Sequence, residues 1–149
     1  MNRSITMRLK DKVAIITGAG MGMGRAASLL FAREGASVLI FDLNEKAAHE
    51  TESMIKSEGG KCAVYIGNVI KEADVKAGVE EAVKQFGKLN ILYANAGVLW
   101  KDRDKSVIET TEENWDIVQA INLKGAFFLT KHGIPYLQKF GGGSIILVG

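Results

Sequence analysis

The sequence has little of what marks several protein classes. Its 149 residues include one cysteine, Cys62, so an intrachain disulfide is impossible and a reducing compartment fits. Within the apolar run "KCAVYIG", Cys62 is interpreted as a small core residue rather than a nucleophile. No apolar run approaches the roughly 18 residues of a membrane span, and the basic N-terminus lacks the apolar segment of a secretory signal. We therefore expect a cytoplasmic protein that does not enter a membrane.

An excess of one charge is also missing. The sequence has 19 Lys and Arg residues and 17 Asp and Glu residues, and these charges are scattered along it. The chain therefore lacks the concentrated positive charge that binds nucleic acid. The two histidines, His49 and His132, show no metal-ligand spacing, and we expect no metal site. Apolar residues make up 47% and charged residues 24%, a mixture typical of one globular domain of this length.

What is present is a regular alternation of apolar runs and helical patterns. Asn44 has the side chain of a helix N-cap, Gly35 and Gly59 are typical helix stops, and Pro135 allows a kink in the last helix. The expected strands span residues 12–20, 37–42, 62–69, 89–97 and 144–148, and the expected helices span residues 22–36, 44–60, 72–87 and 112–140.

This alternation predicts a parallel sheet with right-handed crossovers. The strands are continuous apolar runs, which is expected when helices cover both faces of the sheet. No linker or repeat divides the chain. The fold class is therefore α/β, a three-layer sandwich formed by residues 1–149 as a single domain.

The first strand runs directly into the glycine-rich stretch "TGAGMGMG". A P-loop needs a second glycine where Met23 stands, followed by Lys and Ser or Thr, so that motif is excluded. The motif G-x-G-x-x-G fails at the same residue. What remains is T-G-x-x-x-G-x-G, formed by Thr17, Gly18, Gly22 and Gly24.

Glycines at such a turn let the strand turn sharply, let backbone approach a pyrophosphate and let the helix pack closely. The free N–H groups and the helix dipole then face the phosphates. The alternative is a tight turn that binds no ligand. Asp42 ends the second strand 18 residues after Gly24, where a carboxylate can bind both ribose hydroxyls of an adenosine, although it could instead cap a helix.

Asp42 also bears on the choice of dinucleotide. A 2′-phosphate at this position would meet a negative charge, and the neighbouring residues Met21 and Leu43 are not basic. The sequence therefore favours NAD over NADP.

Together these residues resemble the short-chain dehydrogenase/reductase family, and the resemblance covers residues 10–149. "TGAGMGMG" resembles its glycine segment, and "YANAG" (residues 93–97) its N-N-A-G segment. "NV" (residues 68–69) stands where the family has Asp-Val, and "INLKGAFFLTK" (residues 121–131) resembles its fourth-helix segment. The resemblance implies a Rossmann-type sheet of strand order 3-2-1-4-5-6-7, of which five strands are present.

The resemblance also implies roles for individual residues. The glycine turn, Asp42 with Leu43, and Asn68 with Val69 would bind pyrophosphate, adenosine ribose and adenine in turn. Asn95, Ala96 and Gly97 would line the wall beside the other ribose, and Asn122 matches an active-site Asn that binds a water in a proton relay. Its alternative is a helix residue that bonds locally. The implied residues of the glycine turn are Gly18, Gly20, Met21, Gly22, Met23 and Gly24.

Two departures from the family pattern are visible. Asn68 replaces an Asp, which removes a charge and weakens the expected contact to adenine, and Ala94 replaces the first Asn of N-N-A-G. The loop at residues 99–106 would form part of a substrate pocket, where Trp100 either walls the pocket or covers a core edge.

The family's chemistry is hydride transfer between a nicotinamide and a small alcohol or carbonyl substrate. It uses a Ser after the fifth strand, and a Tyr and a Lys four residues apart. None of Tyr65, Tyr93 and Tyr136 is followed by a Lys at that spacing, so the expected Ser-Tyr-Lys lies beyond residue 149 and the domain is incomplete at its C-terminus. The alternatives are a truncated dinucleotide-binding fragment without activity and a fragment that binds no cofactor.

The end of the sequence predicts exposed apolar surface. The strand at residues 144–148 would form an open edge, and the helix at residues 112–140 would expose residues such as Phe127, Phe128 and Leu129. Because the corresponding helix forms subunit contacts in the family, the resemblance implies a homodimer or homotetramer for the complete protein.

Overall fold

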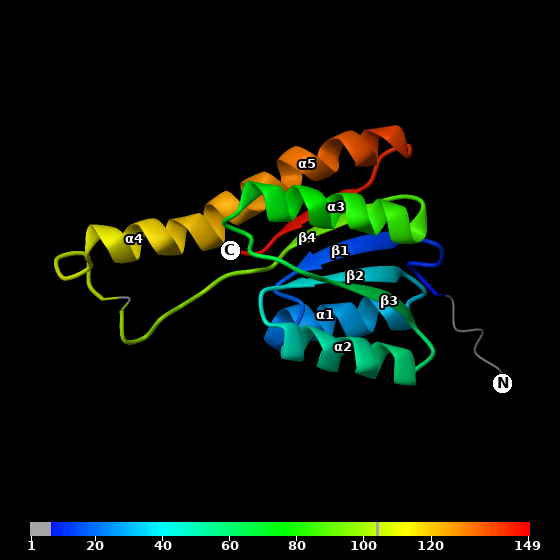
Figure 1. Ribbon diagram of the computed structural model, residues 1–149, viewed down its shortest axis with the longest axis horizontal. Coiled ribbons are helices and arrows are strands. Elements are labelled where there is room, and N and C mark those ends of the chain that lie inside the picture. Colours follow the sequence, from blue (N-terminus) through cyan, green and yellow to red (C-terminus); the bar gives the residue numbers. More distant parts are fainter. Residues whose placement is uncertain (1–6, 104) are drawn as a thin grey trace.

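A computed structural model of the chain describes residues 7–103 and 105–149, and its centre is one parallel five-stranded sheet (Figure 1). The strand order is β3-β2-β1-β4-β5, as predicted, so the α/β Rossmann-type fold is confirmed. The strands are β1 (Val13–Thr17), β2 (Ser37–Asp42), β3 (Lys61–Ile66), β4 (Ile91–Ala94) and β5 (Ser144–Leu147). The helices are α1 (Gly22–Arg33), α2 (Glu45–Ser57), α3 (Glu72–Phe86), α4 (Glu112–Gln119) and α5 (Gly125–Lys139), with a π-helical turn, η1 (Ala120–Lys124), between the last two.

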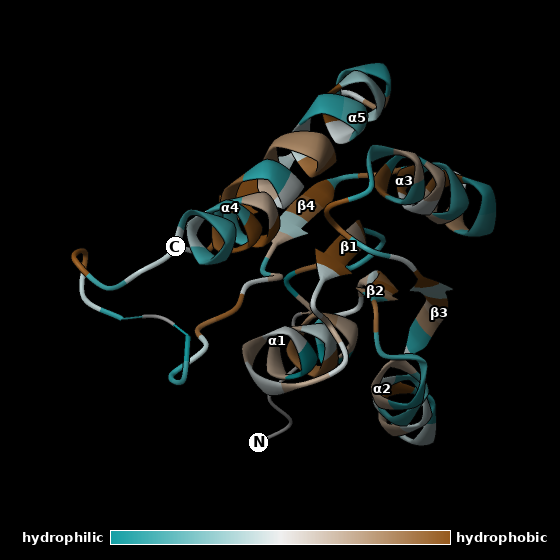
Figure 2. Cartoon of the chain, turned by 60° about the vertical axis from the view of Figure 1, so that its left-hand side comes forward, coloured by the Kyte–Doolittle hydropathy of each residue, from teal (hydrophilic) through white to brown (hydrophobic). Residues whose placement is uncertain are grey.

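Helices cover the two faces of the sheet, with α1 and α2 on one side and α3 and α5 on the other (Figure 2). Successive side chains of a strand point to opposite faces. Ile15 of β1 accordingly packs in the core with α3 and α5, whereas Ile16 packs with α1 and α2. All five residues of β1 are buried, which explains why its sequence is a continuous apolar run.

Three strands end three residues earlier than the sequence predicts, and β5 ends one residue earlier, at Leu147. β1, β3 and β4 end at Thr17, Ile66 and Ala94, and the residues that follow leave the sheet as loops. Gly18 begins one of these loops with a φ of 64°, a left-handed conformation that does not continue a strand. All three loops leave the carboxyl edge of the sheet, where they surround the candidate site described below.

The long helix predicted at residues 112–140 is irregular at a different place from the one expected. Pro135 lies inside α5, and the change in helical pattern falls at η1 instead. A π-helical turn of this kind accommodates one extra residue and is frequently found at functional sites. Beyond it, α4 and the preceding loop extend away from the sheet (Figure 1), and α4 has no buried residue.

The prediction of exposed apolar residues on this helix is partly wrong. Phe128 and Leu129 are buried in the core against the sheet, because the helix turns that side toward β4. Phe127 points outward and is 55% exposed. β5 lies at the edge of the sheet, as expected, and pairs with β4. Within the described part of the chain, no helix is both long enough and apolar enough to span a membrane.

Candidate functional site

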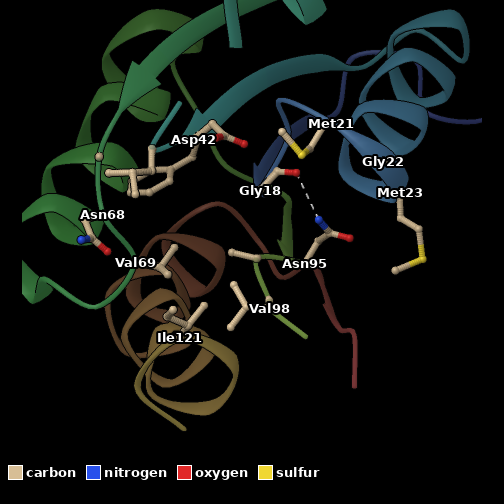
Figure 3. A pocket seen from close by; sticks show the side chains of 15 residues that line it. Gly18, Met21, Gly22, Met23, Asp42, Asn68, Val69, Asn95, Val98 and Ile121 are labelled. Carbon is tan, nitrogen blue, oxygen red and sulfur yellow. Dashed lines mark hydrogen bonds between the residues drawn. The ribbon is translucent and has the colours of Figure 1, made fainter. Parts of the chain in front are cut away.

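A cavity of about 380 Å³ lies at the carboxyl edge of the sheet, where the loops after β1, β2, β3 and β4 converge (Figure 3). This is where ligands bind in open parallel sheets. All of the predicted binding residues except Gly20 and Gly24 line it. Those that do are Gly18, Met21, Gly22, Met23, Asp42, Leu43, Asn68, Val69, Asn95, Ala96 and Gly97.

Four further residues line the cavity that the sequence interpretation missed: Phe41, Gly67, Val98 and Ile121. Each is next in sequence to a predicted residue, so the motifs point to the right loops but not to their full extent. Ile121 differs, because it comes from η1 and reaches the cavity only through the packing of that turn (Figure 3).

The glycine turn brings the start of α1 to this cavity. Gly22 has a φ of 54° and nothing within 4 Å of where a Cβ would stand, so open space lies beside the first residue of α1. A Cβ at Gly24 would instead collide with the carbonyl oxygen of Gly18, which lets α1 pack against the end of β1. Met21 precedes α1 without any side-chain capping bond, and the first turn of α1 contains no acidic residue.

The outer side of the turn is held by side chains from α1 and α2. Arg25 donates from Nε to the Gly20 carbonyl oxygen at 2.9 Å and to the Thr51 hydroxyl at 3.0 Å. Its other end forms an ion pair with Glu50 at 2.9 Å. Thr51, which is fully buried, also contacts the Ala19 carbonyl oxygen at 3.1 Å. Gly20 is therefore part of the scaffold behind the cavity rather than of its wall.

Asp42 connects the turn with the end of β2. Its Oδ2 accepts from the backbone N–H of Gly20 at 2.7 Å, and its Oδ1 accepts from the backbone N–H of Asn44 at 2.8 Å. The cap of α2 is Asn44, as predicted, whose side chain accepts from the Ala47 N–H at 3.0 Å. The alternative in which Asp42 itself caps the helix is therefore wrong, and the carboxylate faces the cavity.

Thr17 and Asn95 join the loop after β1 to the loop after β4. The Thr17 hydroxyl accepts from the N–H groups of Asn95 and Ala96, both at 3.1 Å. In return, Asn95 Nδ2 donates to the carbonyl oxygens of Thr17 at 3.1 Å and Gly18 at 3.3 Å (Figure 3). Asn95 Oδ1 is buried and has no hydrogen-bond partner among the described residues, although buried polar atoms are usually paired.

Comparison with known proteins agrees with this architecture. The sequence pattern of the short chain dehydrogenase family matches residues 12–149. The chain belongs to the short chain dehydrogenase family.

Two relatives are named as an oxidoreductase and a reductase. The chain is 42% identical over 142 residues to an uncharacterized oxidoreductase of Thermotoga maritima, covering 95% of this chain and 55% of the relative. It is 41% identical over 145 residues to the 3-oxoacyl-(acyl-carrier-protein) reductase FabG of the same organism, covering 95% and 56%. The chain thus spans about half the length of these relatives.

A solved structure shows the same fold. The crystal structure of a protein described as a short-chain dehydrogenase/reductase, from Burkholderia xenovorans, superposes with a TM-score of 0.87 at 31% identity. The match covers 93% of this chain and 56% of that one. The family uses nicotinamide cofactors, which is the ligand class that the glycine turn predicts.

Asn122, for which the family resemblance implies a place in a proton relay, lies in η1 and outside the cavity lining. Its Oδ1 accepts from the Val98 N–H at 2.8 Å, and its Nδ2 donates to the Val98 carbonyl oxygen at 3.1 Å. The alternative of a local bond within the helix is therefore wrong. The side chain fixes the loop after β4 to the π-helical turn, and a role in proton transfer remains a prediction.

Other candidate groups lie away from the cavity. Trp100 is outside its lining and contacts Arg103, whose guanidinium lies 5.2 Å from the ring centre. Cys62 is half-buried, and burial, with a smaller contribution from Glu52, raises the pKa of its thiol to about 11. It therefore stays protonated near neutral pH, as the core interpretation predicts. Residues 7–103 and 105–149 contain no group of three metal-ligating side chains.

Proposed function

We propose that this chain forms a single dinucleotide-binding domain and supplies the cofactor half of an oxidoreductase that interconverts an alcohol and a carbonyl compound. The observation that carries the proposal is the start of α1. Its N–H groups have no side-chain cap, no acidic residue stands in its first turn, and open space lies beside Gly22. Such a helix start attracts a phosphate.

The described residues fit a nicotinamide dinucleotide on two further points. Asn95 lines the cavity, and its buried Oδ1 has no hydrogen-bond partner in the described part of the chain; a ribose hydroxyl is a donor that would complete it. Asp42 stands at the end of β2, where a carboxylate binds ribose hydroxyls. When bound, the nicotinamide supplies the group that accepts or donates the hydride.

In this proposal, successive parts of the cavity wall bind successive parts of the dinucleotide. The backbone of the glycine turn binds the pyrophosphate, Asp42 and Leu43 bind the first ribose, and Asn68 and Val69 border the base. Residues 95–97 line the second ribose. Gly20 and Gly24 act indirectly, since both shape the turn from behind the cavity wall.

NAD rather than NADP is the proposed cofactor. A 2′-phosphate on the adenosine ribose would approach the Asp42 carboxylate, and Met21 and Leu43 in the same wall carry no charge. Arg25, a cation behind the turn, is bonded to Gly20, Ala47, Thr51 and Glu50. It would have to leave these partners before it could neutralise an added phosphate.

The proton-transferring groups are proposed to lie outside these 149 residues. A tyrosine that acts as general base needs a lowered pKa and access to the substrate. None of the chain's tyrosines, all within the described residues, lines the cavity. The pKa of Tyr65 is shifted the opposite way, because burial and then the charges of Asp74 and Glu81 raise it. This favours the alternative that the 149-residue chain binds the dinucleotide without turning over a substrate.

Turnover is tested by following NADH absorbance with the chain, NAD and a panel of primary and secondary alcohols. We expect no enzyme-dependent change. Measurable turnover would show that the chemistry is carried by residues of this chain.

The cofactor proposal is tested by calorimetric titration of NAD and NADP into the wild type and Asp42→Ala. The variant also loses the bonds to Gly20 and Asn44, so both affinities should fall, and the ratio of the two dissociation constants is the readout. We expect the preference for NAD to fall by about tenfold or more, because a carboxylate–phosphate repulsion is removed. An unchanged ratio would reduce Asp42 to a structural residue.

An oligomer is proposed for the complete protein. Trp115, Leu123 and Phe127 are 60%, 65% and 55% exposed along α4, η1 and α5. Large exposed apolar residues on one helix are typical of a surface that another chain covers. Sedimentation of the complete protein, with a Phe127→Glu variant as comparison, tests this: a monomer in both cases contradicts it.

A further inference from the structure

Two methionines stand on either side of Gly22 at the start of α1. We propose that the thioethers of Met21 and Met23 form a peroxide-sensitive modification site, and that their oxidation to methionine sulfoxide weakens dinucleotide binding. The effect on binding rests on the proposed function, because it assumes that a dinucleotide occupies the cavity. The place of oxidation does not depend on that function.

Both side chains are open to a reagent in solution. Met21 is 60% exposed and Met23 is 67% exposed, whereas the other methionines of the described residues, Met7 and Met54, are 49% and 41% exposed. Met21 and Met23 also line the cavity, and both extend from the glycine turn (Figure 3). Because oxidation follows the exposure of the side chain, we expect these two residues to react first.

The reduced side chain of Met21 leaves the helix start to a ligand. Met21 holds the N-cap position of α1 in an extended backbone conformation, yet its side chain makes no capping bond, and the first turn contains no acidic residue. A thioether sulfur is only a weak acceptor. The first N–H groups of α1 are therefore available to an external anion, which in the proposed function is the pyrophosphate.

A peroxide changes these side chains in one balanced step. The sulfur lone pair attacks one oxygen of hydrogen peroxide, an S–O bond forms, the O–O bond breaks, and the second oxygen leaves as water with both protons. Sulfur loses two electrons and the peroxide gains them. The product is an uncharged but polar side chain, whose oxygen carries a partial negative charge and accepts hydrogen bonds.

The new oxygens oppose the pyrophosphate in two ways. On Met21, the oxygen is an acceptor attached to the N-cap residue, so it competes for the N–H groups that the phosphate would take. On Met23, it adds partial negative charge to the same wall of the cavity. A sulfoxide has no net charge, so the loss of affinity should be smaller than that caused by a carboxylate. A bound dinucleotide in turn covers both side chains and slows their oxidation.

The modification site is tested by peptide mass spectrometry after timed exposure of the chain to hydrogen peroxide, with and without saturating NAD. We expect sulfoxide at Met21 and Met23 before Met54, which lies on α2 and outside the cavity lining. NAD should slow oxidation of the first two by about fivefold or more and leave Met54 unchanged. Equal oxidation at all three residues, without protection by NAD, would overturn the proposal.

The effect on binding is tested by calorimetric titration of NAD before and after peroxide treatment. The proteins are the wild type, the double variant Met21→Leu with Met23→Leu, and the control variant Met54→Leu. Leucine is close to methionine in volume but contains no sulfur to oxidise. The wild type and the control should lose about fivefold in affinity, and methionine sulfoxide reductases for both epimers should restore it. The double variant should lose none.

Each protein is compared with itself, so a change that the leucines make to the untreated affinity does not enter the result. An equal loss in the double variant would overturn the proposal and leave the proposed function intact. Full affinity of a wild type in which Met21 and Met23 are oxidised would do the same. Failure of the untreated wild type to bind NAD would instead defeat the proposed function, while the order of oxidation at Met21, Met23 and Met54 would still decide the modification site.

Discussion

Helices α1 and α2 pack side by side on one face of the sheet, yet they begin differently. At the start of α2, the Asn44 side chain accepts from the Ala47 N–H at 3.0 Å, and Glu45 adds a negative charge to the first turn. At the start of α1, Met21 contributes no capping bond and the first turn has no acidic residue. A missing cap costs about 1 kcal/mol. We infer that the cap of α2 stabilises that helix, whereas the uncapped start of α1 leaves its N–H groups available to an anionic ligand.

The largest effect is expected where α1 meets the end of β1. Gly24→Ala would place a methyl group against the Gly18 carbonyl oxygen and 2.6 Å from Asn95 Nδ2, so both the helix and the turn must shift. We expect about 1–3 kcal/mol lower stability in urea unfolding and no detectable NAD binding by calorimetry. Gly59→Ala makes the same chemical change after α2, where a Cβ meets nothing within 4 Å but a φ of 77° strains any side chain. It should therefore lower stability without changing NAD affinity. If both variants keep NAD affinity, the close packing at Gly24 is not needed for binding.

A second change gives α1 the kind of start that α2 has. Met21→Asp adds an acidic cap at an exposed residue whose backbone already has extended N-cap geometry. We expect the free protein to gain about 1 kcal/mol in stability, while NAD affinity falls by about tenfold or more because the carboxylate repels the pyrophosphate. Met21→Asn supplies a cap without the charge and should lose much less affinity. Equal NAD binding by wild type and Met21→Asp contradicts the anion site.

The reciprocal change removes the cap of α2. Asn44→Ala deletes the bond to the Ala47 N–H and should lower stability by about 1 kcal/mol in chemical unfolding. NAD affinity should stay within about twofold, since residue 44 keeps the backbone N–H that donates to the Asp42 carboxylate. A large loss of affinity would show that the two helix starts are not separate in function.

The smallest effect concerns α3, whose start is stabilised by charge. Glu72 Oε1 lies 2.7 Å from Lys131 Nζ and 2.9 Å from His132 Nε2, and these hydrogen bonds lower the pKa of Glu72. Its contribution to stability is therefore complete above its unfolded pKa and is lost as the pH falls through the lower folded value. Carbon-detected NMR titration should give a Glu72 pKa below that of a Glu in an unstructured peptide. In Lys131→Met this pKa should rise toward the peptide value, while the bond to His132 still holds it lower; an unchanged pKa would show that Lys131 is not the main cause.

The fold and most of the cavity wall could be predicted because each depends on local pattern. A parallel sheet brings the carboxyl ends of its strands to one edge, so residues such as Asp42, Asn68 and Asn95 meet there whatever the details of packing. Thr51, a polar residue on the buried face of α2, is a sequence signal for a buried hydrogen bond. Its bonds to Ala19, like those of Arg25 to Gly20, join different elements and depend on how the helices dock.

The π-helical turn at residues 120–124 could not be predicted in the same way. The pattern of residues 112–140 is helical throughout, and Pro135 is the only obvious irregularity in it. The turn coincides with the pair of bonds between Asn122 and Val98, which are 24 residues apart. Likewise, the bond from the Ile70 N–H to Asn68 Oδ1 at 3.1 Å depends on how the loop after β3 folds, which the sequence pattern does not show.

The most direct test of the proposed dinucleotide site is an amide NMR titration of the 15N-labelled chain with NAD. If the start of α1 receives the pyrophosphate, the backbone amides of Gly18, Asp42 and residues 21–24 should show saturable shifts, with no change at the start of α4, where Thr111 already caps the helix. Saturable shifts that leave residues 21–24 unchanged, or no binding at millimolar NAD, would contradict the claim that the start of α1 receives the pyrophosphate.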